Sequence, residues 1–512
     1  MARPGFVLEV DDRTPPMVVP HGVGFRLERF PMGTSVVYPP EPLAAVPDVT
    51  EAIDAALDAP LDSAPLTDRL HRGMRLVIAF DDVTTPVPRM PQPDIRGRIV
   101  EAVLRRAAEV GVDDVVLIGA RGLHRRMTEA ELLQLLGERV FRSFYADGKL
   151  GNHDAEDAEQ LSVLSSSDES QLSLNAAAAQ ADLLVHVHIA DHSGNGALAT
   201  AYGLGSTATV SQLTARPGAV GESSPEEIEL LVSGSVNLFT VEAVLDNAAY
   251  SFPLQFLGKR EWEWSLKDRA AWLAVRRGVA VTSVRARSRI RNAARAGYAP
   301  IQIAAGAPAA VARASARQVA AQRLVEVDGQ ADIAVLGVPQ GTPYSADSIT
   351  NPILAAWSAL SAGFAAHTGR PVVRPGGALI LYHSMQPDFS PLHHPSYLDL
   401  FADVLPATTD ATQIAEKFEQ KYATDPWYRH LYQTSYAFHG VHPLHLWYEM
   451  AAARAHCGDI IWVGAHRPTV ERLGFRAAST LADALEIVSS TVGRSPAITY
   501  LHNSAQLVTD VR

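Results

Sequence analysis

Cysteine is almost absent from this chain, whose 512 residues include one, Cys457. A single thiol forms no disulfide within the chain and no thiolate metal cluster, so a metal site has to use histidine, carboxylate or a cofactor. No apolar run approaches the roughly 20 residues of a transmembrane helix, and residues 1–10 lack the basic and apolar segments of a signal peptide. We therefore expect a cytoplasmic location and no membrane partner.

Basic residues are also fewer than acidic residues in this sequence. The sequence has 44 Lys plus Arg against 56 Asp plus Glu, a formal net charge of -12, which disfavours non-specific binding to nucleic acid. The motifs G-x-S-x-G, the Walker loop and H-E-x-x-H are missing, so serine hydrolases, nucleotide phosphotransferases and zincins lack their signatures. No coiled-coil heptad indicates an oligomeric state. These absences argue against a polyanionic partner and against those three classes of enzyme.

Apolar runs that alternate with amphipathic stretches predict an α/β fold. Residues 76–80 and 115–119 are typical of buried strands, and apolar residues at helical spacing between them complete a βαβ unit. Thr128 and Glu131 predict the capping box of a further helix. A third strand is expected over residues 183–189.

The second half of the chain repeats this alternation, with strands expected over residues 331–337, 377–382 and 460–464. An arginine-rich stretch at about 276–306 separates the two halves. We therefore predict two α/β domains, residues 1–290 and 291–512, with a ligand cleft between them as the default site.

Polar residues follow the predicted strands at the carboxyl ends, where α/β sheets hold their ligands. Asp82, with Thr84 and Thr85 close behind it, follows the first strand and either orients a ligand hydroxyl or an imidazole, or simply forms a turn or a helix cap. His124 and Arg125 follow the second strand. An imidazole beside a cation suits proton transfer on an anionic substrate, although a structural histidine is the alternative.

Further histidines follow in the first half of the chain. His186 and His188 point to one face of the third strand, so they are candidate metal ligands or a buried, hydrogen-bonded pair. His192 heads the next loop, which also carries Gly194 and Gly196. Several histidines on strand-end loops favour proton or hydride chemistry over nucleophilic catalysis.

Two other segments carry candidate residues. His153 and Asp154 form a base and its orienting carboxylate, or else a turn capped by the aspartate. In the second half, residues 442–447 end at Trp447 and either close over a ligand or contribute an aromatic side chain to the core.

Taken in order, these motifs resemble the nickel-dependent lactate racemases. The matching segments are D-V-T-T-P-V-P at 82–88, G-L-H-R-R-M-T-E-A-E-L at 122–132, N-H-D at 152–154, D-H at 191–192 before a glycine loop, A-D-I at 331–333, G-G-A-L-I at 376–380 and V-E-R-L-G-F at 470–475. Each segment is short, but their order and spacing are specific. The resemblance covers most of the chain after about residue 70.

The resemblance implies two α/β domains and a racemase or epimerase that acts on a small 2-hydroxy acid. In that family a nickel pincer nucleotide takes a hydride from the carbinol carbon, while one of two histidines removes the hydroxyl proton. By motif, His124 and His192 are similar to these histidines, Asp82 lies in the first turn, and Trp447 matches a substrate-contacting tryptophan. We also expect substrate or cofactor contacts from Thr84, Thr85, Arg125, His153, Asp154, Gly194 and Gly196.

The chain departs from the family at the substrate and cofactor contacts. Thr85 stands where the family has an arginine that helps to hold the substrate, and Arg125 or Arg126 is the expected substitute. Ala197 or Tyr202, depending on the placement of a gap, stands at the lysine that binds the pincer covalently.

The histidine that ligates nickel in the family is missing as well. After His192 the first lysine is Lys259 and the first histidine is His367. A nickel pincer is then held without a covalent bond, or His186 or His188 ligates it, or the protein does not use it. The alternatives are a nickel-independent isomerase or lyase of the same fold, and a ligand-binding member without turnover.

Overall fold

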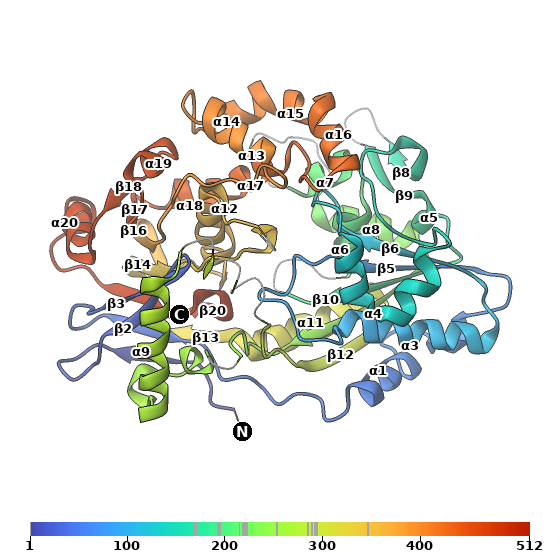
Figure 1. Cartoon of the computed structure of the whole chain (residues 1–512), viewed down its shortest axis with the longest axis horizontal. Coiled ribbons are helices and arrows are strands. Elements are labelled where there is room, and N and C mark those ends of the chain that lie inside the picture. Colours follow the sequence, from blue (N-terminus) through green and yellow to red (C-terminus); the bar gives the residue numbers. More distant parts are fainter. Residues whose placement is uncertain are drawn as a thin grey trace.

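Two separate sheets organise the chain in the computed structural model, which describes residues 2–166, 171–191, 196–214, 216–217, 224–251, 254–283, 286–287, 290, 295–345 and 348–512. Helices cover both sheets (Figure 1). Most neighbouring strands in the two sheets are parallel. The predicted α/β class is confirmed.

The first sheet has six strands, in the order β12 (Pro300–Gly306), β11 (Leu238–Leu245), β10 (Leu183–Ile189), β5 (Arg75–Asp81), β6 (Asp114–Ala120) and β7 (Leu150–Asn152). Only β12 runs antiparallel to its neighbour within this sheet. The predicted strands over 76–80, 115–119 and 183–189 are therefore present, with ends within one residue of the prediction.

The second sheet has seven strands, in the order β1 (Phe6–Glu9), β4 (Ser35–Tyr38), β19 (Ile498–Leu501), β14 (Ala331–Gly337), β16 (Val373–Tyr382), β17 (Asp459–Val463) and β18 (Arg476–Ala478). The membership of the strands does not follow a division at residue 290. β1 and β4 precede the first sheet in the chain but pair in the second, and β12 lies beyond residue 290 but pairs in the first.

The remaining described strands form smaller sheets. One has three strands, in the order β13 (Leu324–Val327), β20 (Val508–Val511) and β15 (His367–Thr368). Two others are strand pairs, β2 (Met17–His21) with β3 (Gly24–Glu28) and β8 (Leu161–Ser166) with β9 (Gln171–Asn175).

The helices associated with the first sheet are α1 (Val49–Asp58), α2 (Leu66–Arg69), α3 (Ile95–Val110), α4 (Glu129–Tyr145), α5 (Ala176–Ala179), α6 (Ala197–Leu204), α7 (Thr207–Leu213), α8 (Pro225–Ser235) and α11 (Pro308–Arg323). The remaining helices are α9 (Leu266–Val281), α12 (Pro352–Trp357), α13 (Pro395–Asp399), α14 (Ala411–Ile414), α15 (Gln420–Thr424), α16 (Pro426–Thr434), α17 (His442–Glu449), α18 (Ala451–His456), α19 (Arg467–Arg472) and α20 (Leu481–Val492).

The side chains of β10 alternate between its two faces, one of which packs against α3 and α4 and the other against α6 and α8. Val185 and Val187 belong to the core that includes α3 and α4, whereas Leu184 belongs to the core with α6 and α8. His186 and His188 share the face of Leu184 because successive side chains of a strand point to opposite faces. The predicted capping box at the start of α4 is also confirmed, since Thr128 and Glu131 exchange both hydrogen bonds.

The two halves of the molecule meet where the loop after β6 contacts residues 432–442. The hydroxyl of Tyr432 donates to the carbonyl of Gly122 at 2.6 Å, and the amide of His439 donates to the carbonyl of Leu123 at 3.0 Å. Figure 1 shows helices α13 to α17 along the upper edge, with α17 and α16 close to α7 of the first half. This junction places side chains from both halves around the loop that carries His124.

Within the described ranges, none of the helices has the length and apolarity needed to cross a membrane.

Candidate functional site

Two neighbouring aspartates at the end of β5 each hold a histidine. Asp81 accepts a hydrogen bond from Nδ1 of His188 at 2.7 Å, and Asp82 accepts one from Nδ1 of His124 at 2.9 Å. The two carboxylates reach different histidines because adjacent residues of a strand point to opposite faces. The result is two Asp–His pairs at the carboxyl edge of one parallel sheet, the edge where α/β proteins bind ligands.

Asp82 is fixed by the turn that follows it. Its Oδ1 accepts the amide of Thr84 at 2.9 Å and the hydroxyl of Thr84 at 2.5 Å, which leaves Oδ2 for His124. Arg96 of α3 donates to the carbonyl of Asp82 and forms an ion pair with Asp94 at 2.8 Å. The turn thus orients the carboxylate, and Thr85 is half-buried beside it. The predicted contacts of Thr84 and Thr85 with a ligand stay predictions.

Electrostatics favour the ionised form of Asp82. Burial alone would raise its pKa, but the neighbouring His124 and the hydrogen bonds from His124 and Thr84 outweigh burial, so the pKa of Asp82 is lowered. An anionic carboxylate that accepts from Nδ1 holds the imidazole in the tautomer that leaves Nε2 for a ligand. The side chain of His124 is 27% exposed, whereas that of Asp82 is 4% exposed.

Aromatic side chains from the second half of the chain surround the ring of His124. Its centroid lies 5.0 Å from Tyr344, 5.4 Å from His442 and 6.0 Å from Phe438. The predicted acid/base histidine therefore lies at the junction of the two halves. The sequence analysis did not identify Tyr344 or Phe438, because only the tertiary contact brings them to His124.

The second pair lies deeper in the first half. Burial alone would lower the pKa of His188, but the charge of Asp81 and its hydrogen bond raise it to about 10. His186 lies beside it, with ring centroids 6.0 Å apart, and its Nδ1 is 2.9 Å from the hydroxyl of Thr200 in α6. Both histidines are buried, with His188 hydrogen-bonded to Asp81 and His186 to Thr200, and their ligation of a metal stays a prediction.

The glycine loop after β10 is only partly described, and the predicted residues His192 and Gly194 lie outside the described residues. Gly196 begins α6, and its amide donates to Oε1 of Glu242 at 2.7 Å. Its φ of +65° and the carbonyl of Pro308, which a Cβ would approach to 3.0 Å, explain why glycine stands there.

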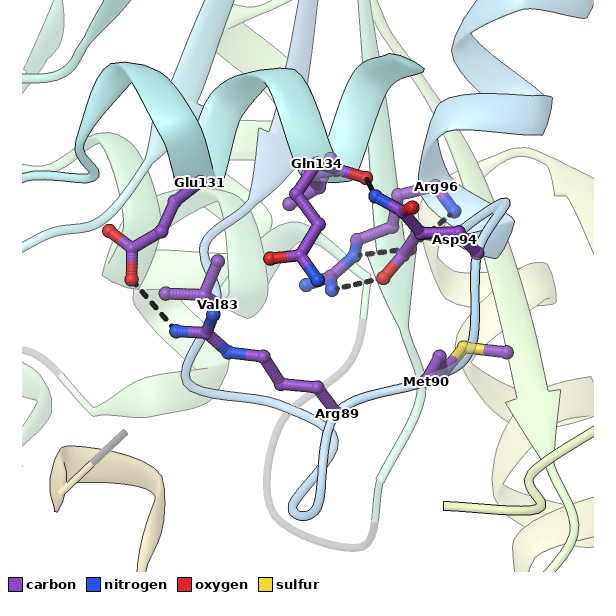
Figure 2. A pocket seen from close by; sticks show the side chains of 9 residues that line it. Val83, Arg89, Met90, Asp94, Arg96, Glu131 and Gln134 are labelled. Atoms are coloured by element: carbon purple, nitrogen blue, oxygen red, sulfur yellow. Dashed lines mark hydrogen bonds and ion pairs between the residues drawn. The ribbon is translucent and has the colours of Figure 1, made fainter. Parts of the chain in front are cut away.

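Arg125 has a buried carboxylate partner within its own domain. Its guanidinium pairs with both oxygens of Glu131, at 2.6 and 2.9 Å, and Arg89 reaches the same carboxylate at 2.7 Å. Figure 2 shows Arg89 directed at Glu131 in a small pocket that Gln134 and the Arg96 side chain also line. Arg125 therefore stabilises the start of α4 in this structure, and its predicted contact with a substrate carboxylate stays a prediction.

His153 and Asp154 do not pair with each other. Nε2 of His153 lies 2.9 Å from the carbonyl of Gly205, and its Nδ1 lies 3.3 Å from the amide of Asn175, while Asp154 accepts the amide of Glu156 at 2.9 Å. Burial lowers the pKa of His153 to about 4. Asp154 thus caps a turn in this structure, and the predicted contacts of His153 and Asp154 with a substrate or cofactor stay predictions.

Trp447 lies in the core of the second half. Its ring is fully buried, and its indole N–H donates to the carbonyl of Thr409 at 3.1 Å. The same helix, α17, instead brings His442 to His124. His442 and His445, three residues apart in α17, are a sequence signal that could have indicated a helix face in contact with the first half.

The residues at the expected cofactor positions do not fit a covalently held nickel pincer. Ala197 is fully buried in the apolar core beside α6, and the hydroxyl of Tyr202 donates to the carbonyl of Leu213 at 2.7 Å. Lys259 pairs with Asp268 at the start of α9, and His367 lies in β15 of another sheet. No group of three or more metal-binding side chains occurs among the described residues.

The fold and the site define a two-sheet α/β protein with histidine–aspartate pairs at strand ends. Residues 25–212 match the family model described as the lactate racemase N-terminal domain, the family that the motifs of this part of the chain resemble. None of the curated proteins matches the chain.

Solved structures extend the likeness in fold to nearly the whole chain. The lactate racemase apoprotein from Thermoanaerobacterium thermosaccharolyticum is 16% identical, with a TM-score of 0.62, and the match covers 96% of this chain and 99% of that one. A protein from Thermotoga maritima is 12% identical, with a TM-score of 0.49, over 92% of this chain and 100% of that one. The fold is thus that of the lactate racemase apoprotein.

Proposed function

We propose that this chain is an isomerase, a racemase or epimerase, that acts at the carbinol carbon of a small 2-hydroxy acid. The observation that carries the proposal is the carboxylate of Asp82, which holds His124 by Nδ1 at the junction of the two halves. Inversion of a carbon centre requires groups that serve its two faces; His124 serves one face, and the motif assigns the other to His192, which lies outside the described residues. The match of residues 25–212 to the lactate racemase N-terminal domain supports the choice of substrate class.

His124 is the group that we assign to proton transfer with the substrate. Asp82 holds its Nδ1–H, so Nε2 accepts a proton from the substrate, and the carboxylate stabilises the imidazolium that forms. The partial exposure of His124 gives a small acid access to this nitrogen. Removal of the C2 proton leaves a planar carbon, and a second acid, the role that the motif assigns to His192, then adds a proton to the opposite face; exchange with solvent restores both groups.

His188 differs from His124 in charge and burial. Asp81 raises its pKa to about 10, so His188 is protonated at neutral pH. Because the carboxylate of Asp81 balances this charge at 2.7 Å, we assign the pair to the stability of the strand end and not to proton transfer. We derive no step through a nickel pincer, because Ala197, Tyr202, Lys259 and His367 do not supply its expected attachments.

The test uses pure enantiomers of lactate and of larger 2-hydroxy acids, incubated with the protein in D2O and separated by chiral chromatography. Interconversion with deuterium at C2 supports proton transfer by the histidines, whereas interconversion without deuterium indicates internal return of a hydride and a hydride acceptor. Binding of a 2-hydroxy acid with no interconversion of any of them would contradict the isomerase and favour the ligand-binding alternative.

A further inference from the structure

His442 comes from the second half of the chain and faces His124 edge-on. The two ring centroids lie 5.4 Å apart at an interplanar angle of 84°. His442 begins α17 and is 5% exposed, so this contact is part of the buried junction between the halves. The site around His124 therefore contains a second imidazole, and no family motif quoted above includes it.

Tyr397 determines which nitrogen of His442 carries the proton. The hydroxyl of Tyr397 lies 2.5 Å from Nδ1 of His442, and both residues are buried. Burial raises the pKa of Tyr397 well above its usual value, so the phenol keeps its proton and donates it. Burial, together with His124 and the other nearby histidines, lowers the pKa of His442 well below its usual value. An uncharged imidazole that accepts at Nδ1 carries its hydrogen on Nε2.

Aromatic rings seal the other sides of His442. Tyr344 lies 4.7 Å from His442 and 5.0 Å from His124, and Phe438 lies 4.9 Å from His442, between ring centroids. The carbonyl of Tyr344 accepts a hydrogen bond from Nε2 of His394 at 2.9 Å, which fixes the segment that carries the ring. A hydrogen bond in such an apolar, low-dielectric surrounding is stronger than one in water.

No described residue takes a hydrogen bond from Nε2 of His442. Arg125, the expected partner of a substrate carboxylate, is paired with Glu131 in this structure. The Nε2–H of His442 is an uncharged donor on a ring that lies beside His124. A neutral imidazole donates without acting as a strong acid, and it leaves proton exchange to another group.

We propose that His442 is a substrate-binding residue that donates its Nε2–H to the carboxylate of the 2-hydroxy acid, while His124 exchanges the proton. This inference deepens the function proposed above and rests on it for the substrate class. Tyr397 is then a positioning residue, because it acts on the substrate only through the tautomer of His442.

The test is a histidine-selective 15N NMR titration of the full-length protein with L-lactate, with the His442 signals assigned from their loss in His442→Gln. We expect His442 to be the Nε2–H tautomer at neutral pH and its Nε2–H to shift in a saturable way with lactate and with propionate, which keeps the carboxylate. Propane-1,2-diol, which lacks it, should leave the signal unchanged.

Other outcomes overturn the inference in distinguishable ways. A shift of the His124 signals without a shift of His442 would reject the role of His442 and leave the proposed site in place. If neither histidine responds to lactate, both the inference and the proposed function fail.

Matched variants separate hydrogen bonding from packing. His442→Phe should weaken lactate binding by roughly 10- to 100-fold, the effect of a lost hydrogen bond to a charged group, whereas His442→Gln, which retains an N–H donor, should lose much less. His445→Phe changes a histidine one turn further along α17, which lies against Ser211 and Thr214, and should leave lactate binding near the wild-type value. Equal loss in His442→Phe and His445→Phe would show that packing at the junction, and not donation by His442, sets the affinity.

Discussion

Oδ2 of Asp82 lies 2.9 Å from Nδ1 of His124, across the space between the loops that follow β5 and β6. The amide and hydroxyl of Thr84 donate to the other carboxylate oxygen, Oδ1. The carboxylate is therefore held in one orientation, and the imidazole is held in one tautomer. This relationship makes His124 a directed proton acceptor, because its Nε2 is the nitrogen left for a ligand.

Asp82→Asn tests the orienting role directly. The amide side chain can present an N–H to His124 in place of an acceptor, so the imidazole loses its tautomer, and turnover should fall by roughly 100-fold or more. Steady-state rates on the best 2-hydroxy acid measure the effect, and a thermal melt shows whether the variant is folded. Asp154→Asn is the matched control, because Asp154 only caps a turn at the amide of Glu156. Equal loss in both variants would contradict a special role for Asp82.

Because of the Asp81–His188 pair, we expect the free energy of unfolding to decrease as the pH rises into the alkaline range. The pKa of His188 is raised from 6.5 to about 10 in the folded protein, so its stabilisation is fully present below pH of about 6.5 and is lost as pH rises through about 10. Urea unfolding at pH 6, 8 and 10 should show a larger decline for wild type than for Asp81→Asn, in which His188 lacks the carboxylate charge. Parallel declines in the two proteins would be evidence against the ion pair.

Tyr432 joins the two halves through its hydroxyl, which donates to the carbonyl of Gly122 at 2.6 Å and accepts the amide of Ala155 at 3.1 Å. Tyr432→Phe leaves both buried backbone groups without this partner and should lower the free energy of unfolding by about 1–3 kcal/mol. Chemical denaturation measures the loss. Tyr436→Phe, on the same segment, should change stability by less than about 0.5 kcal/mol, as surface substitutions usually do.

The residues at the expected cofactor positions predict that the nickel pincer forms no covalent adduct with this chain. When the chain is produced in a host that makes the nickel pincer nucleotide, intact-mass measurement should give the unmodified chain, because the buried Ala197 has no amine to attach it. Nickel analysis and the ultraviolet-visible spectrum of the same sample complete the experiment. Stoichiometric nickel with cofactor absorbance would show that the group is held by other contacts, and hydride transfer would then replace the proton route.

Local patterns predicted the strands and their ends well. The strand over 183–189 coincides with β10, and the capping box of Thr128 and Glu131 has both of its hydrogen bonds. These features depend on neighbouring residues and side-chain period alone. The pairing of β1 and β4 with the second sheet was not predicted, because it joins segments more than 290 residues apart in the sequence.

The site was predicted only in part, for the same reason. Asp82 and His124 were identified because each follows a buried strand, and the structure brings them together. The roles suggested for Arg125 and Trp447 depended on partners that sequence does not show, namely Glu131 and the carbonyl of Thr409. A buried salt bridge or indole hydrogen bond is visible only after folding.

The role of His124 in proton transfer is tested most directly by the rate of interconversion in wild type and in His124→Gln, measured from each pure enantiomer of the best 2-hydroxy acid. We predict that the rate of interconversion falls in His124→Gln by roughly 100- to 10,000-fold, the contribution of a positioned acid or base. The affinity for the acid should stay within about threefold of the wild-type value, because binding is assigned to other groups. Interconversion at the wild-type rate in His124→Gln would contradict the assignment of proton transfer to His124.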